Sequence, residues 1–268
     1  MNPDLRRRIL PAIIYVVVIV GASLVGNLSA LVLIQVFSLI CIYEFISNSF
    51  KEGDQAISGR YVVGIILFGT LLINLVHNEY IWKALLWMTT AVYTYNAVLI
   101  MSRGSSVFSH GNVLLSAIAL ALMPFLLSVH QLMLPGMFHY TLLGVFIILW
   151  LNDAGAYFVG RAVGRNKIHP TISPGKTWEG WIGGVLLGLG TAWIVSQYLT
   201  HLDFQDWIII SVICGVMGIL GDLTESAWKR KHEIKDSGTI MPGHGGFLDR
   251  LDSFIYSIPF VILYLSTI

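Results

Sequence analysis

The sequence contains few charged residues and very few cysteines. Asp, Glu, Lys and Arg make up only 12% of its 268 residues, against about 25% in an average soluble protein. This scarcity excludes an intrinsically disordered chain, because disorder requires high charge and low hydrophobicity. Cys41 and Cys214, the only cysteines, each lie in an apolar run, so a secreted disulfide scaffold is excluded as well. Hydrophobic residues make up 56% of the chain, and water is therefore not its main solvent.

The chain also lacks an excess of charge of either sign. Its formal net charge at pH 7 is +1. Proteins that bind nucleic acid usually carry a basic patch that contacts phosphates, so we expect no nucleic-acid partner. No internal repeat with a period of roughly 20–50 residues is visible, so a solenoid is not indicated either.

Nine apolar stretches are present, each near the roughly 20 residues that cross about 30 Å of hydrocarbon. They lie at about 9–26, 28–47, 61–76, 81–101, 112–130, 138–160, 178–199, 206–228 and 252–268. We therefore predict an all-α, polytopic membrane protein with about nine transmembrane helices, forming a single integral membrane domain over 1–268.

The basic residues predict how these helices are oriented. Every Lys and Arg except Lys83 falls at one set of helix ends, which comprises the N-terminal end and the loops that follow the even-numbered helices. Cytoplasmic loops are enriched in Lys and Arg. The N-terminus and these loops are therefore expected in the cytoplasm, and the C-terminus outside.

The two halves of the chain differ in their loops. Residues 1–136 carry few ionisable groups and are expected to serve packing and a lipid cavity. Residues 137–268 contain two long loops, about 161–177 and 229–251, which are dense in Gly, Pro and charged residues. We expect the chemistry in these catalytic helices and their cytoplasmic loops.

Acidic side chains occur inside the predicted eighth and sixth helices. Asp222, Glu225, Ser226 and Lys229 recur at i, i+3, i+4 and i+7, which places them on one helical face, and Asp153 lies at a similar depth. A carboxylate in hydrocarbon is costly unless it is paired or bound to a cation, so the set indicates a functional site. A structural salt bridge, Asp222 with Lys229 or Asp153 with a nearby Arg, is the alternative for any single residue.

A glycine-rich segment, 242–246, precedes the ninth predicted helix. Its glycines let backbone N–H groups approach an anion closely, and His244 lies among them. Asp249 and Asp252, three residues apart, share a face at the start of the helix. Carboxylates from two helix ends can hold a hard divalent cation, and Mg²⁺ is expected because it prefers oxygen ligands. A plain glycine-rich turn with a helix N-cap at Asp252 is the alternative.

The loop before the seventh predicted helix carries Ser173, Lys176 and Thr177. A P-loop would need Gly at position 170, where this chain has Pro170, so that motif is excluded. What remains is a group of hydroxyls and an ammonium at a helix N-terminus, which is suited to holding phosphate. Three glycines spaced four apart in the helix are expected to form a close-packing face: Gly180, Gly184 and Gly188.

Several of these segments together resemble the signature of one enzyme family. The longest comprises Ser226-Ala227-Trp228-Lys229-Arg230, then Lys235-Asp236, then Pro242-Gly243-His244-Gly245-Gly246-Phe247-Leu248-Asp249-Arg250-Leu251-Asp252. The shorter blocks are Gly221-Asp222-Leu223-x-Glu225-Ser226, Asp153-x-x-Ala156-Tyr157-x-x-Gly160-Arg161 and Ser173-Pro174-x-Lys176-Thr177-x-Glu179-Gly180. The combination resembles the bacterial phosphatidate cytidylyltransferases, or CDP-diacylglycerol synthases. The resemblance is close over about 150–252.

The resemblance implies a reaction, cofactors and partners. CTP and phosphatidate would be the substrates, and CDP-diacylglycerol and pyrophosphate the products of phospholipid biosynthesis. The lipid phosphate would attack the CTP α-phosphorus at the cytoplasmic membrane interface, with Mg²⁺ held by Asp222 and Asp249. A potassium ion beside the Mg²⁺, a homodimer, contact with the lipid bilayer and a location in the inner, cytoplasmic membrane are further expectations of the resemblance.

The same resemblance suggests roles for individual residues. Those expected to be catalytic are Asp222, Glu225, Lys229, Arg230, His244, Asp249 and Asp252. Those expected to contact CTP or phosphatidate are Asp153, Ser173, Lys176, Thr177, Glu179, Ser226, Lys235, Asp236, Gly245, Gly246 and Arg250. Glu44, an acid of the second predicted helix, lies outside all these motifs and is expected to tolerate neutralisation.

Three other functions compete with this one. A secondary transporter would show related halves with broken helices and a site near the midplane, whereas here the halves differ and the charges gather near one face. A purely structural scaffold gives no reason to bury several acids. The CDP-alcohol phosphotransferases handle the same liponucleotide through a D-G-x-x-A-R motif, whose spacing Asp153-Ala154-Gly155 does not supply.

Overall fold

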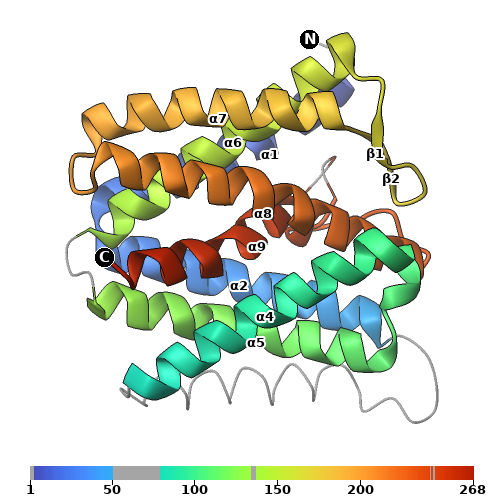
Figure 1. Ribbon diagram of the computed structural model, residues 1–268, viewed down its shortest axis with the longest axis horizontal. Coiled ribbons are helices and arrows are strands. Elements are labelled where there is room, and N and C mark those ends of the chain that lie inside the picture. Colours follow the sequence, from blue (N-terminus) through green and yellow to red (C-terminus); the bar gives the residue numbers. More distant parts are fainter. Residues whose placement is uncertain (1–2, 51–78, 134–136, 242, 244) are drawn as a thin grey trace.

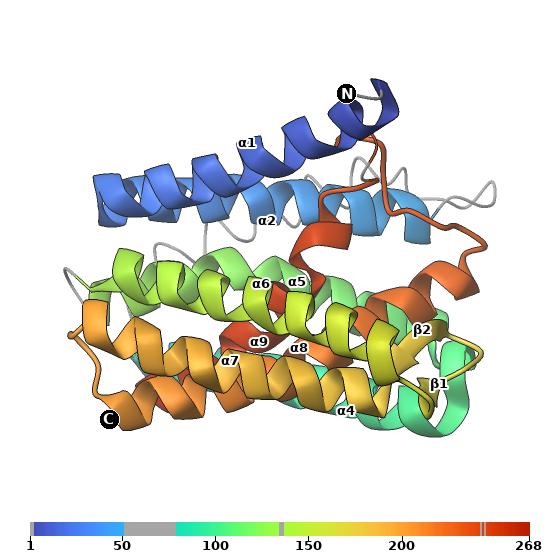
Figure 2. The ribbon, with the colours of Figure 1, turned by 90° about the horizontal axis from the view of Figure 1, so that it is seen from above.

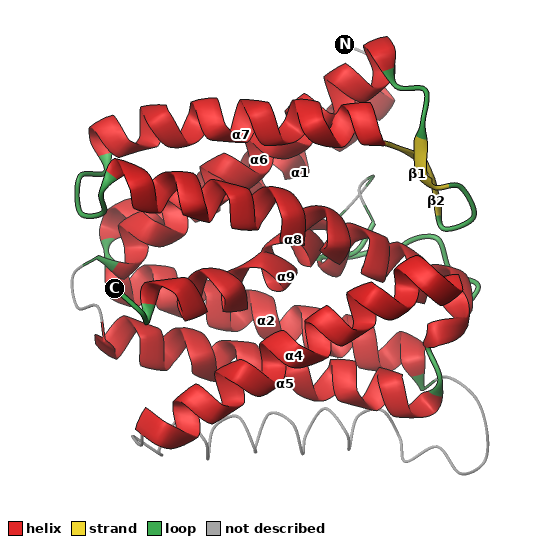
Figure 3. Ribbon diagram, in the orientation of Figure 1, coloured by secondary structure: helices red, strands yellow, loops and turns green. Residues whose placement is uncertain are grey.

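The computed structural model describes residues 3–50, 79–133, 137–241, 243 and 245–268. Long helices make up most of this part of the chain, as Figures 1 and 3 show. In chain order they are α1 (Pro3–Val25), α2 (Asn27–Ser49), α4 (Glu79–Arg103), the 3₁₀ turn η1 (Gly104–Val107), α5 (His110–Met133), α6 (Phe138–Val163), α7 (Trp178–Tyr198), α8 (Phe204–Lys231) and α9 (Leu248–Leu265). The predicted helical architecture is confirmed, with one short hairpin added to it.

Six of the described helices are long and apolar enough to cross a membrane. They are α2, α4, α5, α6, α7 and α8, and they coincide with six of the stretches predicted from the sequence. Together with their apolar composition, this makes the chain a multi-pass membrane protein.

The other three predicted membrane helices are not among these six. The stretch at 9–26 corresponds to α1, whose apolar part, Leu10–Val25, is shorter. The stretch at 252–268 falls in α9, which begins with a charged segment. The stretch at 61–76 lies outside the described residues. The count of nine and the orientation in the membrane therefore stay predictions.

Helix α1 runs opposite to α2, and the helices from α4 to α9 alternate in direction along the bundle (Figures 1 and 2). The loop between α6 and α7 and the end of α8 lie at the same end, on the right in Figure 1, whereas the α1–α2 and α7–α8 connections lie at the opposite end. Helix α9 packs along α8. The two charged segments that the sequence singles out are thereby brought to one region of the molecule.

The departure from an all-α fold is a hairpin between α6 and α7. Strand β1 (Lys167–His169) pairs antiparallel with β2 (Ser173–Thr177), and Lys167 lies opposite Thr177. Sequence reasoning missed these strands because segments so short show no usable alternation of apolar and polar residues. The hairpin leads Lys176 and Thr177 onto the N-terminus of α7.

Helices α6 and α7 pack with their backbones in close contact. A Cβ added at Gly184 would lie 2.6 Å from the carbonyl oxygen of Asn152, and one at Gly180 would lie 2.7 Å from that of Ala156. Side chains do not approach so closely, so the predicted close-packing role of these two glycines is confirmed. This packing fixes the segment of α6 that carries Asp153.

Helix α9 is joined to its neighbours by stacked aromatic rings. Phe254 stacks on Phe146 of α6, and Tyr256 stacks on Tyr93 of α4, each with ring centroids 4.5 Å apart. The Tyr256 hydroxyl also donates a hydrogen bond to the carbonyl oxygen of Tyr93 at 2.5 Å. Such pairs add directional packing to the burial of apolar area. They hold α9 firmly, and with it the acidic residues at its start.

Candidate active site

Three carboxylates of α8 and α9 form a cluster. Oxygen atoms of Asp222, Glu225 and Asp252 all lie within 4.8 Å of one another. The α8 pair shares one helical face, as the spacing predicts, and α9 packs alongside. Glu225 is only 7% exposed, and its Oε1 has no hydrogen-bond partner among the described residues. Like charges this close repel one another unless a positive charge lies among them.

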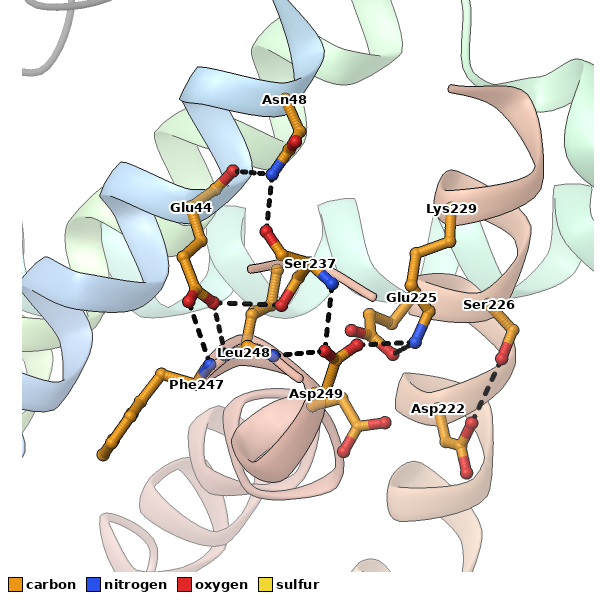
Figure 4. A network of polar contacts seen from close by, with 12 residues as sticks. Glu44, Asn48, Asp222, Glu225, Ser226, Lys229, Ser237, Phe247, Leu248 and Asp249 are labelled. Carbon is orange, nitrogen blue, oxygen red and sulfur yellow. Dashed lines mark hydrogen bonds and ion pairs between the residues drawn. The ribbon is translucent and has the colours of Figure 1, made fainter. Parts of the chain in front are cut away.

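Lys229 joins this cluster to Asp249 (Figure 4). Its Nζ lies 2.7 Å from Glu225 Oε2 and 2.7 Å from Asp249 Oδ1. The exposed fraction of the Lys229 side chain is 16%, and that of Asp249 is 6%. Pairs shielded from water in this way interact more strongly than surface pairs. The salt bridge considered from the sequence, Asp222 with Lys229, is thus replaced by pairs with Glu225 and Asp249.

Asp249 also holds the loop in front of α9. Its Oδ2 accepts hydrogen bonds from the backbone N–H of Ser237 at 2.9 Å and of Gly246 at 2.7 Å. The N–H of Gly246, expected to meet a substrate anion, is therefore engaged by a carboxylate of the chain itself. A substrate contact at Gly246 stays a prediction.

The same loop contains glycines in the left-handed region. Gly243 has φ +77° and Gly245 has φ +91°, values that L side chains rarely adopt. The N–H of Met241 donates to the carbonyl oxygen of Gly245 at 3.0 Å, which closes the turn. Helix α9 begins at Leu248, so Asp252 lies inside the helix and the alternative of an N-cap at Asp252 is wrong.

Lys176 of β2 reaches across to Asp222 of α8. Its Nζ forms an ion pair with Asp222 Oδ2, and Ser226 Oγ donates to Asp222 Oδ1 at 3.2 Å. Both partners of the ion pair remain partly open to solvent. A residue predicted to hold phosphate and a residue predicted to hold metal thus meet at one point.

A cavity of about 870 Å³ opens beside these groups. Ligand pockets usually measure about 300–1,000 Å³, so it is large enough for a nucleotide or a lipid headgroup. Its acidic lining residues are Asp153, Asp222, Asp249 and Asp252. Its basic lining residues are Arg161, Lys167, Lys176 and Arg250. Apolar and aromatic residues of α1 and α6 complete the wall: Ala12, Tyr15, Val16 and Trp150.

Three residues predicted to act on substrate also hold loops in place. Thr177 Oγ1 caps α7 by accepting a hydrogen bond from a backbone N–H at 3.1 Å. Glu179 accepts a hydrogen bond from the side chain of Asn166 at 2.6 Å. Arg230 Nε donates to the carbonyl oxygen of Ile172 at 3.4 Å, which ties α8 to the hairpin. Their roles toward substrate stay predictions.

The remaining predicted residues differ in whether they line the cavity. Lys235 and Asp236 are exposed in the loop after α8, and Ser173 lies at the start of β2. None of these three lines the cavity described above. Arg250 does line it, and His244 lies outside the described residues.

Two contributors were not identified from the sequence. Lys167 reaches the cavity through a hairpin that the sequence did not predict. Glu44 is 3% exposed and accepts hydrogen bonds from Ser237, Phe247 and Leu248, so it contacts the loop before α9 although it lies outside every motif. Its partner Ser237 follows 193 residues later, and no local motif could reveal the contact.

The sequence matches the family model of the cytidylyltransferases over residues 6–268. The chain belongs to the cytidylyltransferase family. Membership extends from α1 to α9, well beyond the region 150–252 in which the motifs lie.

Curated relatives of this cytidylyltransferase come from several bacteria. The phosphatidate cytidylyltransferase of Bacillus subtilis (strain 168) is 30% identical over 270 residues, which cover 98% of both chains. The protein of the same name from Staphylococcus aureus (strain COL) is 33% identical over 261 residues, covering 94% of this chain and 95% of the relative. That of Haemophilus influenzae (strain ATCC 51907 / DSM 11121 / KW20 / Rd) is 44% identical over 150 residues, or 52% of each chain.

Proposed function

We propose that this member of the family is a phosphatidate cytidylyltransferase, which converts CTP and phosphatidate to CDP-diacylglycerol and pyrophosphate. Relatives with this name align with nearly the whole chain, which supports the proposal. The observation that carries it is a single cavity with both charged and apolar walls. Such a cavity suits two polyanionic substrates, one of which is a lipid.

The charged wall and the apolar wall of the cavity suit different parts of the substrates. Lys176, Arg161 and Lys167 supply positive charge, which suits the phosphates of CTP and of the lipid. Tyr15 of α1 and Trp150 of α6 supply apolar surface, which suits the glycerolipid next to its headgroup. The family resemblance and this division of charge point to the same pair of substrates.

In the proposed reaction, a non-bridging oxygen of phosphatidate attacks the α-phosphorus of CTP in line. The bond from the α-phosphorus to the oxygen that bridges to the β-phosphate breaks, and pyrophosphate leaves with that oxygen. Such transfers depend on positioning and on neutralisation of charge. We propose that the basic residues of the cavity neutralise the charge of the substrate phosphates. The contact between Lys229 and Asp249 would hold the acidic first turn of α9 in place.

The acidic cluster fits a divalent cation. Asp222, Glu225 and Asp252 present oxygens close together, and Glu225 Oε1 is buried without a partner among the described residues. Mg²⁺ prefers oxygen ligands and usually shares its coordination shell with substrate phosphates. We propose that Asp222 holds Mg²⁺ together with Glu225 and Asp252. When bound, the ion would neutralise charge on the phosphates.

Asp249, the second ligand expected from the sequence, remains a proposed ligand. Its Oδ1 contacts Lys229, which also contacts Glu225, so an ion at Asp249 would have to displace the ammonium. The potassium ion beside the Mg²⁺ rests on the family resemblance alone.

The setting in the cell is part of the proposal. We place the chain in the inner membrane of a bacterium, with nine helices, a cytoplasmic N-terminus and the loops of 137–268 facing the cytoplasm. Residues 1–136 would serve packing and the lipid side, and the α1 residues in the cavity wall support this. A homodimer is expected from the resemblance.

The topology can be tested with reporters. A reporter fused after Ile268 should read as external, and one inserted near Arg165 should read as cytoplasmic. Finding both on the same side would contradict the topology.

The activity can be tested by measuring pyrophosphate release from purified protein in detergent. Phosphatidate is supplied with CTP, dCTP, ATP or GTP, with and without Mg²⁺, and the Asp222→Asn variant serves as the blank. Release that requires the lipid, a cytidine nucleotide and Mg²⁺ is expected. Release without phosphatidate would contradict the proposal. Uptake of a solute into vesicles without pyrophosphate release would favour a transporter.

A further inference from the structure

Glu44 of α2 binds the loop that leads into the acidic start of α9 (Figure 4). Its Oε1 accepts a hydrogen bond from the N–H of Phe247 at 3.0 Å, and its Oε2 accepts one from the N–H of Leu248 at 2.9 Å. The first N–H groups of a helix have no partner inside the helix and attract negative charge. A carboxylate from a distant helix therefore occupies the N-terminus of α9.

Ser237 connects Glu44 with Asp249. Its hydroxyl donates to Glu44 Oε2 at 2.9 Å, and its backbone N–H donates to Asp249 Oδ2 at 2.9 Å. The side chain of Asn48, one turn after Glu44, donates to the carbonyl oxygen of Ser237 at 2.6 Å. In Figure 4 Ser237 lies between the two carboxylates, which hold the same piece of loop from opposite sides.

The loop is shaped around this carboxylate. A Cβ at Gly238 would overlap Glu44 Oε1, and one at Gly246 would lie 2.6 Å from Glu44 Oε2 and overlap Ser237 Oγ. Only glycine allows the loop to approach Glu44 so closely at both positions. Gly246, which the sequence marks as part of an anion-binding segment, therefore lies against a carboxylate of the chain itself, that of Glu44.

We infer that Glu44 is a positioning residue of the active site, which acts by fixing Ser237 and the segment 246–248 and so the direction of Asp249 toward Lys229. Glu44 does not line the 870 Å³ cavity, so its effect on turnover passes through the loop. The inference rests on the proposed function, because that function gives Asp249 its role in the reaction.

The decisive variant is Glu44→Gln, which keeps the size of the side chain and replaces one acceptor oxygen by an NH₂ group. We expect kcat to fall by about 10- to 100-fold, the range found when supporting groups of metal sites are changed, and the Mg²⁺ concentration for half-maximal rate to rise. The KM for CTP should change less than kcat. Glu44→Asp, which keeps the charge, should retain more activity than Glu44→Gln.

A control on the same helix separates positioning from general packing. Gln35 of α2 donates to the carbonyl oxygen of Pro124 at 2.7 Å and to Ser128 Oγ at 2.6 Å, both in α5. Gln35→Leu removes two contacts between helices without touching the loop. It should keep the wild-type kcat and Mg²⁺ dependence.

Hydrogen exchange gives a readout that does not depend on activity. In detergent without substrates, the amides of Ser237 and of 246–248 should exchange faster in Glu44→Gln than in the wild type or in Gln35→Leu, because either Phe247 or Leu248 loses its acceptor. Unchanged exchange, or a wild-type kcat and Mg²⁺ requirement, would overturn the inference. If Glu44→Gln does not fold, Ser237→Ala, which removes one hydroxyl, takes its place. This variant should then show the lower kcat and the faster amide exchange expected of Glu44→Gln. Wild-type values of both quantities in Ser237→Ala would overturn the inference.

The two levels of the proposal can fail separately. If the wild-type enzyme releases no pyrophosphate from CTP and phosphatidate, the proposed function is wrong, and the exchange comparison still decides whether Glu44 anchors the loop. Contact between Glu44 and Gly238 gives a further check. Gly238→Ala should impair activity, and Glu44→Asp in the same chain should restore part of it, because the shorter side chain makes room for the methyl group.

Discussion

Lys176 of the β1–β2 hairpin forms an ion pair with Asp222 of α8, although the two residues are 46 positions apart in the sequence. The motifs mark Lys176 for phosphate and Asp222 for metal, and in this structure each neutralises the other. A substrate phosphate would compete for the ammonium, and a cation would compete for the carboxylate. Binding of nucleotide and of metal should therefore be coupled through this pair.

Replacing Lys176 by Ala should mainly raise the KM for CTP. The ammonium lies in the cavity wall, and loss of a charge-assisted hydrogen bond costs about 1.5–3 kcal/mol, or roughly 10- to 100-fold in affinity. Lys231→Ala, an exposed lysine at the end of α8, is the matched control and should leave both KM values unchanged. Titrating each substrate in turn checks the assignment. An increase confined to phosphatidate would mean that Lys176 binds the lipid phosphate.

Asp222→Asn and Asp249→Asn should each lower turnover by about 100-fold with little change in folding. Both substitutions keep the size of the side chain and remove the charge that a hard cation, or the Lys229 ammonium, requires. Size-exclusion profiles in detergent report on folding, and pyrophosphate release reports on activity. Glu233→Gln, an exposed acid just after α8, is the control. If both aspartate variants turn over at near wild-type rates at limiting Mg²⁺, Asp222 and Asp249 are not ligands of the metal.

The sequence predicts those features that depend on neighbours along the chain. Hydrophobic stretches of membrane length locate α2 and α4 to α8, since burial in lipid needs only a continuous apolar run. The helical period places Asp222, Glu225 and Lys229 on one face of α8, and the contacts confirm it for Glu225 with Lys229. Glycines at a spacing of four predict the close packing of α7 on α6 in the same way.

Contacts between distant segments could not be predicted in this way. Lys229 turns toward Asp249 because α9 packs along α8, and the loop at Ser237 is held by Glu44 because α2 lies beside that loop. Neither pairing has a fixed spacing, so each depends on how the helices pack in three dimensions. The hairpin that carries Lys167 to the cavity was missed because its strands are too short to show a period.

Gly184→Ala should destabilise the protein by about 1–3 kcal/mol, as expected when a methyl group is forced into a packed interface. The added Cβ would lie 2.6 Å from the carbonyl oxygen of Asn152, a backbone atom that cannot move aside easily. Gly190→Ala is the matched control on the same helix, because no described atom outside its own stretch of helix lies within 4 Å of its Cβ position. Thermal unfolding in detergent should show a lower midpoint for Gly184→Ala alone. Equal midpoints would mean that α6 and α7 separate at little cost.

Lys229 neutralises two buried carboxylates at once, and its removal should therefore affect stability as well as activity. In Lys229→Ala, Glu225 and Asp249 lose their common partner, which should cost about 3 kcal/mol, as when one member of a buried ion pair is removed. Adding Glu225→Gln removes one of the two unpaired charges and should restore part of that stability. The double variant should nevertheless remain inactive, because the acidic cluster has lost an oxygen ligand and the link to Asp249.

Unfolding of these Lys229 variants is measured in detergent with a chelator present, so that no metal replaces the ammonium, and Lys231→Ala serves as the control. If Glu225→Gln destabilises the Lys229→Ala chain further, the two residues are not coupled and the cluster is neutralised in some other way.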